Sequence, residues 1–164
     1  MKVLVADDDP IARRLVEASL QRAGYDPVTA VDGVEALRLL EPLDGPRLAV
    51  LDWLMPGLDG LSVCRAIRTA RQEPYVYVVV LTGNEGHEDI VEGLDAGADD
   101  YMTKPCDLHE LEARLRAGAR ILALQDQLAD ARERLRETAT HDPLTGLLNR
   151  GAILETLPKE SARS

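Results

Sequence analysis

The sequence predicts an α/β fold in which a parallel sheet of five strands is covered by helices on both faces. Over about the first 106 residues, short apolar runs alternate with segments whose apolar residues recur at helical spacing. The apolar runs are continuous rather than alternating, which is typical of strands buried on both faces. Five such repeats occupy about 120 residues. A chain of 164 residues therefore has room for one domain of ordinary size and a modest appendage.

Five short segments between the helical ones are predicted to be strands, and most of them are apolar. The first, Lys2 to Ala6, runs directly into three acids, and Tyr75 to Leu81 has the clearest strand character. The other three are Pro27 to Ala30, Leu48 to Leu51 and Asp100 to Thr103. Helical segments separate them, so neighbouring strands are expected to run parallel.

Helices are predicted in the intervals between the strands. In the first, Ile11 and Leu15 begin a helical repeat that ends at Gly24. Three more helices are predicted at Val34 to Leu40, Leu61 to Ile67 and Asp89 to Leu94, the last stopped by Gly97. Helices in these positions cover both faces of a parallel sheet.

Polar residues gather where the predicted strands end. The first strand ends at Asp7 and Asp8, the third at Asp52, the fourth at Thr82 and the fifth at Lys104. Each residue alone has a structural explanation, as a helix cap, a turn residue or a solvated cation. Ligands of such folds bind beyond the carboxyl ends of the strands. The joint placement at four strand ends therefore favours a functional site.

The three consecutive acids Asp7, Asp8 and Asp9 have two possible explanations. Neighbouring carboxylates repel by about 4 kcal/mol per pair at ~4 Å and an effective dielectric constant of ~20, so a hard cation is a natural partner. Alternatively, the acids form a surface turn in which Asp9 caps a helix that begins at Pro10. The triplet alone leaves both interpretations open.

Four motifs resemble those of the receiver domain of two-component response regulators. They are Asp7-Asp8, the segment 52–60 (DWLMPGLDG), Thr82-Gly83 and the segment 97–105 (GADDYMTKP). The resemblance covers about residues 1–122. It implies a flavodoxin-like (βα)5 sheet of strand order 2-1-3-4-5. It also implies transfer of a phosphoryl group to Asp52 from a histidine kinase or a phosphotransfer protein.

The resemblance also implies a Mg²⁺ site, which Mn²⁺ would suit as well. Asp8 would ligate the ion directly, and Asp7 would act largely through water. Asp52 would be both ligand and nucleophile, and the backbone carbonyl of Leu54 would complete the protein ligands. An aspartyl-phosphate phosphatase that acts on outside substrates would want a second acid two residues after the nucleophile, at position 54, so the leucine there argues against that alternative.

Three further residues receive roles from the resemblance. Lys104 and the Thr82 hydroxyl would each contact a phosphoryl oxygen, which their charge and donor capacity suit. Thr82 and Tyr101 would form the switch, with the aromatic ring rotating inward on phosphorylation. A plain half-buried strand aromatic is the alternative for Tyr101.

After Asp107 the chain is predicted to form one long helix, Leu108 to about Thr138, because it contains no proline and no strand pattern. We expect a receiver domain over residues 1–122 and a helical linker over 123–140. Five residues at heptad-like spacing predict a short coiled coil and a homodimer: Ile121, Leu124, Leu128, Ala131 and Leu135. A merely amphipathic helix is the alternative.

The segment His141 to Arg150 (HDPLTGLLNR) resembles the start of the GGDEF domain of diguanylate cyclases. The resemblance implies that this chain is the N-terminal part of a receiver–GGDEF cyclase, with residues 141–164 as a truncated start of the cyclase domain. The Gly-Gly-acid-acid-Phe loop is absent, as is any phenylalanine. Cyclase activity is therefore expected of a full-length parent and not of this chain.

Composition narrows the range of partners. The formal net charge of −10 opposes binding to nucleic acid or to an anionic membrane. No apolar run approaches the ~20 residues of a membrane span and no signal peptide is apparent, so a cytoplasmic protein is expected. The resemblance to receiver domains implies a phosphorylation-controlled signalling module, with self-phosphorylation and self-dephosphorylation at Asp52 as its only chemistry. A dimerisation module independent of phosphorylation is the alternative.

Overall fold

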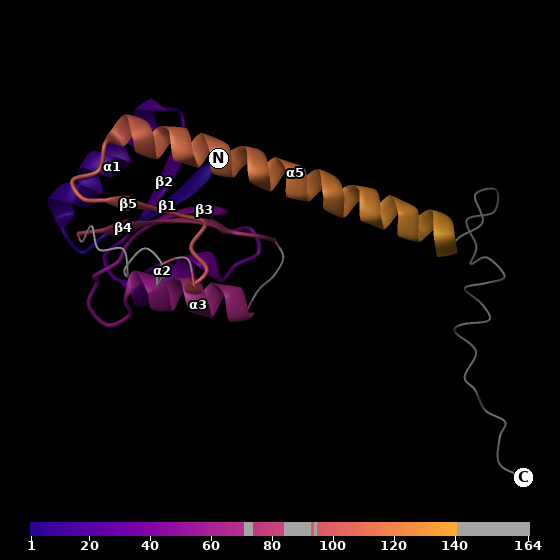
Figure 1. The fold of residues 1–164 in the computed structure, drawn as a ribbon, viewed down its shortest axis with the longest axis horizontal. Helices are drawn as coiled ribbons and strands as arrows, with labels where there is room; N and C mark the ends of the chain where they lie inside the picture. Colours follow the sequence, from indigo (N-terminus) through magenta and orange to yellow (C-terminus); the bar gives the residue numbers. More distant parts are fainter. Residues whose placement is uncertain (71–73, 84–92, 94, 141–164) are drawn as a thin grey trace, which may run out of the picture. The chain divides into compact units, whose positions relative to one another are not determined.

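A computed structural model describes residues 1–70, 74–83, 93 and 95–140. Five parallel strands form one sheet in the order β2-β1-β3-β4-β5 (Figure 1). The strands are β1 (Lys2–Ala6), β2 (Asp26–Ala30), β3 (Leu48–Asp52), β4 (Tyr77–Thr82) and β5 (Asp100–Thr103). The predicted flavodoxin-like α/β fold and its strand order are confirmed.

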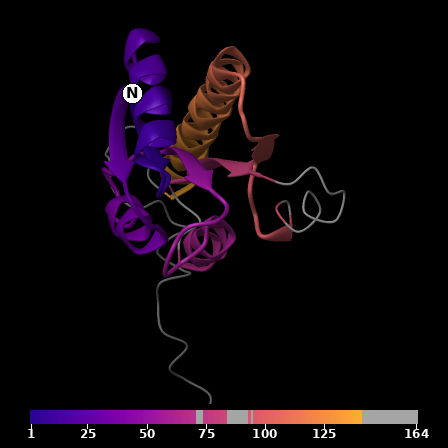
Figure 2. The ribbon, with the colours of Figure 1, turned by 90° about the vertical axis from the view of Figure 1, so that its left-hand side faces the viewer.

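Helices cover both faces of this sheet. The described helices are α1 (Pro10–Arg22), α2 (Gly33–Leu40), α3 (Gly60–Ala70) and α5 (Leu108–Thr140). Helices α1 and the first part of α5 lie on one face, and α2 and α3 lie on the other (Figures 1 and 2). The helix predicted at Asp89 to Leu94 falls, apart from residue 93, outside the described residues.

The continuous apolar runs of the strands are explained by two core layers. In β1, Leu4 packs in the layer beneath α2 and α3, whereas Val3 and Val5 pack in the layer beneath α1 and α5. All three side chains are fully or almost fully buried. Because successive residues of a strand point to opposite faces, a strand covered on both sides has no position for a polar residue until it ends.

Strand β4 differs from its predicted range at both ends. It begins at Tyr77 rather than Tyr75, because Tyr77 is the residue that pairs with Leu48, the first residue of β3. It extends to Thr82, whose carbonyl accepts a hydrogen bond of 2.7 Å from the Lys104 backbone N–H. The other described elements differ from their predicted ranges by a few residues at their ends, where helix and strand assignment is least certain.

Asp9 caps helix α1. Its side chain accepts a hydrogen bond of 2.8 Å from the Ile11 backbone N–H, and Pro10 occupies the first helical position. Proline suits this position because the first N–H groups of a helix have no partner within the helix. Asp9 therefore caps the helix, as the second explanation of the three acids predicted. Asp7 and Asp8 do not cap it and have a different role.

Helix α5 belongs to two compact units of the chain, Met1–Leu122 and Ala123–Ser164. In the first unit Leu111, Leu115 and Leu122 are fully or almost fully buried. In the second unit the side chains of Leu124, Leu128 and Leu135 are all more than half exposed, and Ala131 is exposed as well. No helix among the described residues is both long enough and apolar enough to cross a membrane.

A glycine allows α5 to approach β4 closely. Gly118 is buried between Leu115 and Leu122, and a Cβ atom there would lie 2.4 Å from Cδ1 of Tyr77. No side chain fits at that distance without a shift of the helix or of the ring. Glycine has a low helix propensity, and at position 118 it is required by packing rather than by a helix end.

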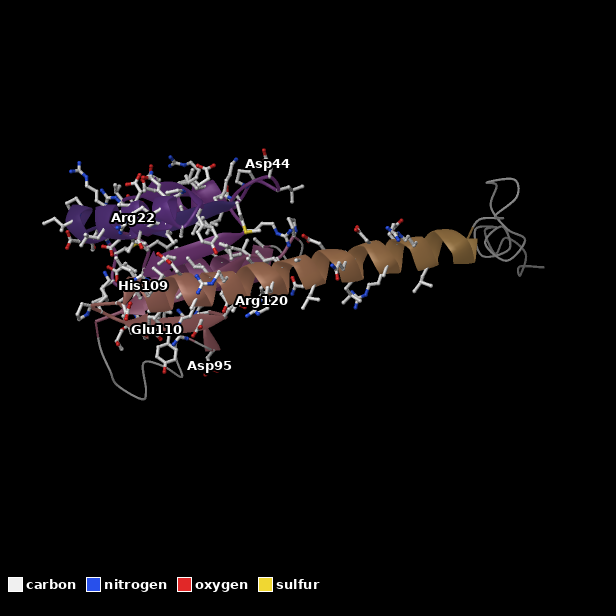
Figure 3. All side chains as sticks on the ribbon, turned by 90° about the horizontal axis from the view of Figure 1, so that it is seen from above. Arg22, Asp44, Asp95, His109, Glu110 and Arg120 are labelled. Carbon is white, nitrogen blue, oxygen red and sulfur yellow. The ribbon has the colours of Figure 1, made fainter. Side chains whose placement is uncertain are left out.

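A buried polar contact joins α1 to α5. The Ser19 hydroxyl donates a hydrogen bond of 2.8 Å to Glu112 Oε1, and Ser19 is almost completely buried. The two residues line a cavity of about 320 Å³ together with Arg22 and His109, which Figure 3 labels on α1 and α5. This contact holds the two helices that flank the strand ends of β1 and β5.

Candidate functional site

Three carboxylates converge at the carboxyl ends of β1 and β3. One oxygen from each of Asp7, Asp8 and Asp52 lies within 4.8 Å of the other two. Among the described residues, this is the single group of three or more potential metal-binding side chains at that spacing. Asp7 is 2% exposed and Asp52 6%, whereas Asp8 is exposed. The cluster thus combines two buried charges with one that solvent can reach.

Lys104 brings a positive charge to the same place. Its Nζ lies 2.7 Å from Asp7 Oδ2 and 3.0 Å from Asp52 Oδ2. Burial lowers the pKa of Lys104, but its hydrogen bonds to Asp7 and Asp52 more than offset that effect, so the pKa is raised overall. The ammonium therefore stays charged at neutral pH and bridges two carboxylates that belong to different strands.

The environment of Asp52 disfavours its negative charge. Burial is the largest cause of its raised pKa, and the carboxylates of Asp7 and Asp8 add to it, while Lys104 acts in the opposite direction. One ammonium thus compensates only part of the charge of three carboxylates. A second cation at this point would remove the remaining repulsion.

The donor set fits Mg²⁺. Carboxylate oxygens are hard ligands, and Mg²⁺ is usually held by one or two carboxylates while it keeps several waters. Asp8 is exposed and can turn toward an ion, and Asp52 offers a buried oxygen next to it. Leu54, the second residue after β3, exposes 72% of its surface, so its side chain does not cover this edge of the sheet. The acidic cluster is compatible with the predicted ion.

Thr82 and Gly83 border the site on the side of β4. Thr82 is the last residue of the strand and is 4% exposed. A Cβ atom at Gly83 would meet no heavy atom within 4 Å, so the space beside Thr82 is open. The peptide bond between Lys104 and Pro105 is cis. Thr82 and Lys104 therefore lie on two neighbouring strand ends, as the resemblance implied.

The loop that follows Asp52 is packed closely against the end of β3. The backbone N–H of Trp53 donates to the Leu81 carbonyl at 2.8 Å, and the Gly60 N–H donates to the Trp53 carbonyl at 2.9 Å. A Cβ atom at Gly60 would lie 2.3 Å from the Asp52 carbonyl oxygen. The glycine that begins α3 thus permits the approach that holds Asp52 in place.

Tyr101 lies in the middle of β5, away from the strand end. It is half-buried, and its register partner is Val80, whereas Thr82 pairs with Thr103. It contributes to a cavity of about 470 Å³ whose other lining residues are Met102, Thr103, Pro105, Asp107, Glu110 and Arg114. The structure brings Tyr101 near the first turns of α5 and leaves its role as a switch a prediction.

The residues of the predicted dimer seam do not take part in this site. Ile121 is 41% exposed within the first unit, and Leu124, Leu128, Ala131 and Leu135 are exposed within the second. Their exposure is what an unpaired coiled-coil face would show, and it is also what a merely amphipathic helix would show. The seam therefore stays a prediction.

Two residues that sequence reasoning overlooked shape the site. Arg13 donates a hydrogen bond from Nη1 to the Asp7 backbone carbonyl. Gly33 begins α2, where a Cβ atom would lie 1.9 Å from the Leu58 carbonyl oxygen. The one sequence signal for Arg13 is a basic residue one turn into a helix that follows three acids. Gly33 has no local signal, because its neighbour lies in a distant loop.

The family of the chain is shown by comparison with known proteins. Residues 3–116 match the family model described as the response regulator receiver domain. The chain is 42% identical over 153 residues to the response regulator MprA of Mycobacterium ulcerans, covering 93% of this chain and 65% of that protein. MprA of Mycobacterium tuberculosis matches at 42% over 151 residues, covering 92% of this chain and 64% of the relative. The chain thus spans slightly less than two thirds of these relatives.

Solved structures agree. The receiver domain of the Francisella response regulator 1452 has a TM-score of 0.66 and 38% identity, covering 71% of this chain and 94% of that one. The chemotaxis protein CheY4 of Vibrio cholerae has a TM-score of 0.65 and 32% identity, covering 71% and 96%.

The resemblance of His141 to Arg150 to a cyclase domain lies outside the described residues. The family model ends at residue 116, and the relatives named above are described as response regulators. Neither finding extends to a diguanylate cyclase. The five-stranded sheet, the acidic cluster at its carboxyl edge and the matching family model agree with one another: the chain belongs to the response regulator receiver domains, the phosphoryl-accepting modules of two-component systems.

Proposed function

We propose that Asp52 is the phosphoacceptor and that its phosphorylation requires Mg²⁺ held by Asp8, Asp52 and the Leu54 carbonyl. Mn²⁺ would substitute for Mg²⁺, and Asp7 would act through a water ligand. The observation that carries the proposal is the contact of Lys104 with both Asp7 and Asp52, 2.7 Å and 3.0 Å away, at the point where three carboxylates meet. A charge arrangement of this kind is suited to receiving a phosphoryl group.

The donor in this proposal is a phosphohistidine of a histidine kinase or a phosphotransfer protein. A carboxylate oxygen of Asp52 attacks phosphorus, the P–O bond forms as the P–N bond breaks, and the histidine nitrogen leaves with the electron pair. Lys104 would hold one phosphoryl oxygen, and the Thr82 hydroxyl would donate to another. When bound, Mg²⁺ supplies positive charge that neutralises the phosphoryl oxygens during transfer.

The proposed output is a change in dimerisation. Phosphorylation would draw the Thr82 hydroxyl toward the phosphoryl group and turn Tyr101 inward, which would alter the surface of β5 and α5. The exposed apolar residues of α5 from Ile121 to Leu135 would then pair with those of a second copy. Because the net charge of these 164 residues is −10, we propose that they bind neither nucleic acid nor an anionic membrane. We also propose a cytoplasmic location.

The test is phosphorylation by a small donor. The protein is incubated with acetyl phosphate with and without Mg²⁺, and intact mass and molar mass in solution are both measured. One phosphoryl addition that requires Mg²⁺ and is lost in Asp52→Asn is expected, together with a larger molar mass. Asp44→Asn is the matched control, because Asp44 is an exposed acid in the loop after α2 (Figure 3).

The other outcomes identify the competing functions. No addition at any Mg²⁺ concentration, with a dimer in every condition, would identify the module as one that dimerises without phosphorylation. Continuous release of phosphate without accumulation of the phosphoprotein would indicate a phosphatase. An addition that persists in Asp52→Asn would place the acceptor at another residue.

We propose further that the full-length protein is a diguanylate cyclase controlled by this receiver. The support is the motif from His141 to Arg150, which lies directly after α5. The DNA that follows codon 164 is expected to encode a Gly-Gly-acid-acid-Phe loop, and the full-length protein is expected to convert GTP to cyclic di-GMP faster when phosphorylated. A different domain after codon 164 would refute this part of the proposal and leave the role of Asp52 untouched.

A further inference from the structure

Arg13 contacts the turn between β1 and α1, which carries Asp7 and Asp8. Its backbone N–H donates to the Asp9 carbonyl at 3.0 Å, and its Nη1 donates to the Asp7 carbonyl at 2.5 Å. The bond to Asp9 is an ordinary helix hydrogen bond of the backbone, so the contact that the arginine side chain itself supplies is the one with the Asp7 carbonyl. Its side chain is half-buried where it reaches back across the first turn of α1.

The other polar groups of Asp7 also have partners. Oδ1 accepts from the Asp9 backbone N–H at 2.9 Å, and Oδ2 accepts from Lys104 Nζ at 2.7 Å. The Asp7 backbone N–H donates to the Ala30 carbonyl at 3.3 Å. Asp7 is therefore held in one position, and the carboxylate with freedom to turn toward an ion is the exposed one of Asp8.

We propose that Arg13 is a positioning residue for the metal site: by holding the Asp7 carbonyl it directs the Asp8 carboxylate toward the bound cation. This inference rests on the Mg²⁺-dependent function proposed above. Groups that orient metal ligands commonly change metal affinity by about tenfold or more when they are removed. Arg13 touches neither the ion nor the phosphoryl group in this role, because its contact is with a backbone carbonyl.

The charge of Arg13 and its hydrogen bond to Asp7 predict opposite changes in Mg²⁺ affinity when the arginine is replaced. A cation next to a metal site repels the metal, so removal of the charge alone would tighten Mg²⁺ binding. Loss of the hydrogen bond to Asp7 would loosen the loop and weaken binding. Arg14 provides the matched control, since it is the next residue of α1, carries the same charge and is exposed.

The experiment measures Mg²⁺ affinity by calorimetry, and in parallel by the fluorescence of Trp53, the single tryptophan. Arg13→Gln is expected to bind Mg²⁺ about tenfold more weakly than wild type, while Arg14→Gln binds as well as wild type or slightly better. Arg13→Lys keeps one donor and the charge, and is expected to recover most of the affinity. Thermal unfolding of each variant shows that the folded protein is being compared.

Binding by Arg13→Gln that equals or exceeds that of wild type would overturn the inference. If Arg13→Gln does not fold, Arg13→Lys and Arg13→Met are compared in its place, and equal Mg²⁺ affinity of the two would overturn it. A wild-type protein that shows no Mg²⁺ binding at all would instead refute the proposed function. A failure of the proposed role of Arg13 is thus distinguishable from a failure of the proposed Mg²⁺-dependent function.

Discussion

The Lys104 ammonium lies closer to Asp7 than to Asp52, at 2.7 Å from the one carboxylate oxygen and 3.0 Å from the other. Asp7 is also the more deeply buried of the two acids. A buried carboxylate needs a partner, because an uncompensated charge in the interior is costly. Lys104 is therefore a structural counter-ion of Asp7, in addition to its proposed role as a ligand of a phosphoryl oxygen.

Lys104→Met is expected to destabilise the protein without Mg²⁺. The change leaves the carboxylates of Asp7 and Asp52 without their ammonium, which should lower the free energy of unfolding by about 2 kcal/mol. Mg²⁺ should restore most of this loss, because it supplies the missing charge. Urea denaturation in EDTA and in a saturating concentration of Mg²⁺ measures both values, with the exposed Lys2→Met as control. An equal loss in both buffers would contradict this account.

Asp52→Asn is expected to be more stable than wild type at pH 7.5 in EDTA, on the order of 1 kcal/mol. The pKa of Asp52 is raised by burial and by Asp7 and Asp8, so the folded protein binds this proton more tightly than the unfolded chain does. Ionised Asp52 therefore destabilises the fold. The advantage of the asparagine should shrink as the pH falls through the folded pKa, and it should vanish below the unfolded value of about 3.9.

The same pair of proteins should change order when Mg²⁺ is added, because the ion stabilises the wild type and has lost a ligand in Asp52→Asn. Chemical denaturation between pH 7.5 and pH 4.5 in EDTA, repeated with Mg²⁺ at pH 7.5, measures both effects. A variant that is less stable than wild type at pH 7.5 in EDTA would show that the contact with Lys104 outweighs the repulsion.

Gly118→Ala is expected to lower the free energy of unfolding by about 1–3 kcal/mol, because its Cβ would lie 2.4 Å from the Tyr77 ring. Helix propensity alone predicts the opposite, a gain of about 1 kcal/mol. Gly93→Ala is the control, since Gly93 is also helical and a Cβ there would meet nothing within 4 Å. Thermal and urea unfolding of the two variants measure the change in stability and show whether close packing or helix propensity determines it. Equal effects of both substitutions would remove the packing explanation.

Arg68→Met is expected to cost about 2–3 kcal/mol of stability. The Arg68 guanidinium pairs with Asp99 at 2.8 Å, donates to the Gly97 carbonyl at 2.9 Å and lies against the Tyr75 ring. It thereby ties the end of α3 to the segment that leads into β5. Arg38→Met, on the exposed face of α2, serves as the comparison in urea denaturation. A loss no greater than that of the control would mean that solvent compensates the three contacts.

Tyr101→Ala is expected to retain phosphorylation of Asp52 but to weaken the association that follows it. Tyr101 pairs with Val80, two positions before the strand end where Thr103 pairs with Thr82, and it is not among the residues proposed to contact the phosphoryl group. Intact mass measures the first property and light scattering the second, with acetyl phosphate as donor. Association of the phosphorylated variant at wild-type strength would exclude Tyr101 as the switch.

The sequence by itself determined the fold class, the strand order through its resemblance, and the placement of Asp7, Asp8, Asp52, Thr82 and Lys104 at strand ends. Apart from the strand order, these properties are readable because they are local. A continuous apolar run indicates a strand buried on both faces, and the first polar residue after it marks where the strand leaves the core. Even the cap of α1 by Asp9 follows from residues that are two positions apart.

Only the tertiary structure decided which atoms of these residues meet. Lys104 and Asp7 are 97 residues apart in the chain, and no periodicity reveals that their contact is shorter than the one to Asp52. By propensity alone a glycine at position 118 only weakens the helix, and the reason for it is the Tyr77 ring on a distant strand. No pattern in the sequence distinguishes Arg13 from its exposed neighbour Arg14, and the first turn of α1 brings it to the Asp7 carbonyl. Such contacts depend on how elements pack, and packing is a property of the folded chain rather than of any segment in it.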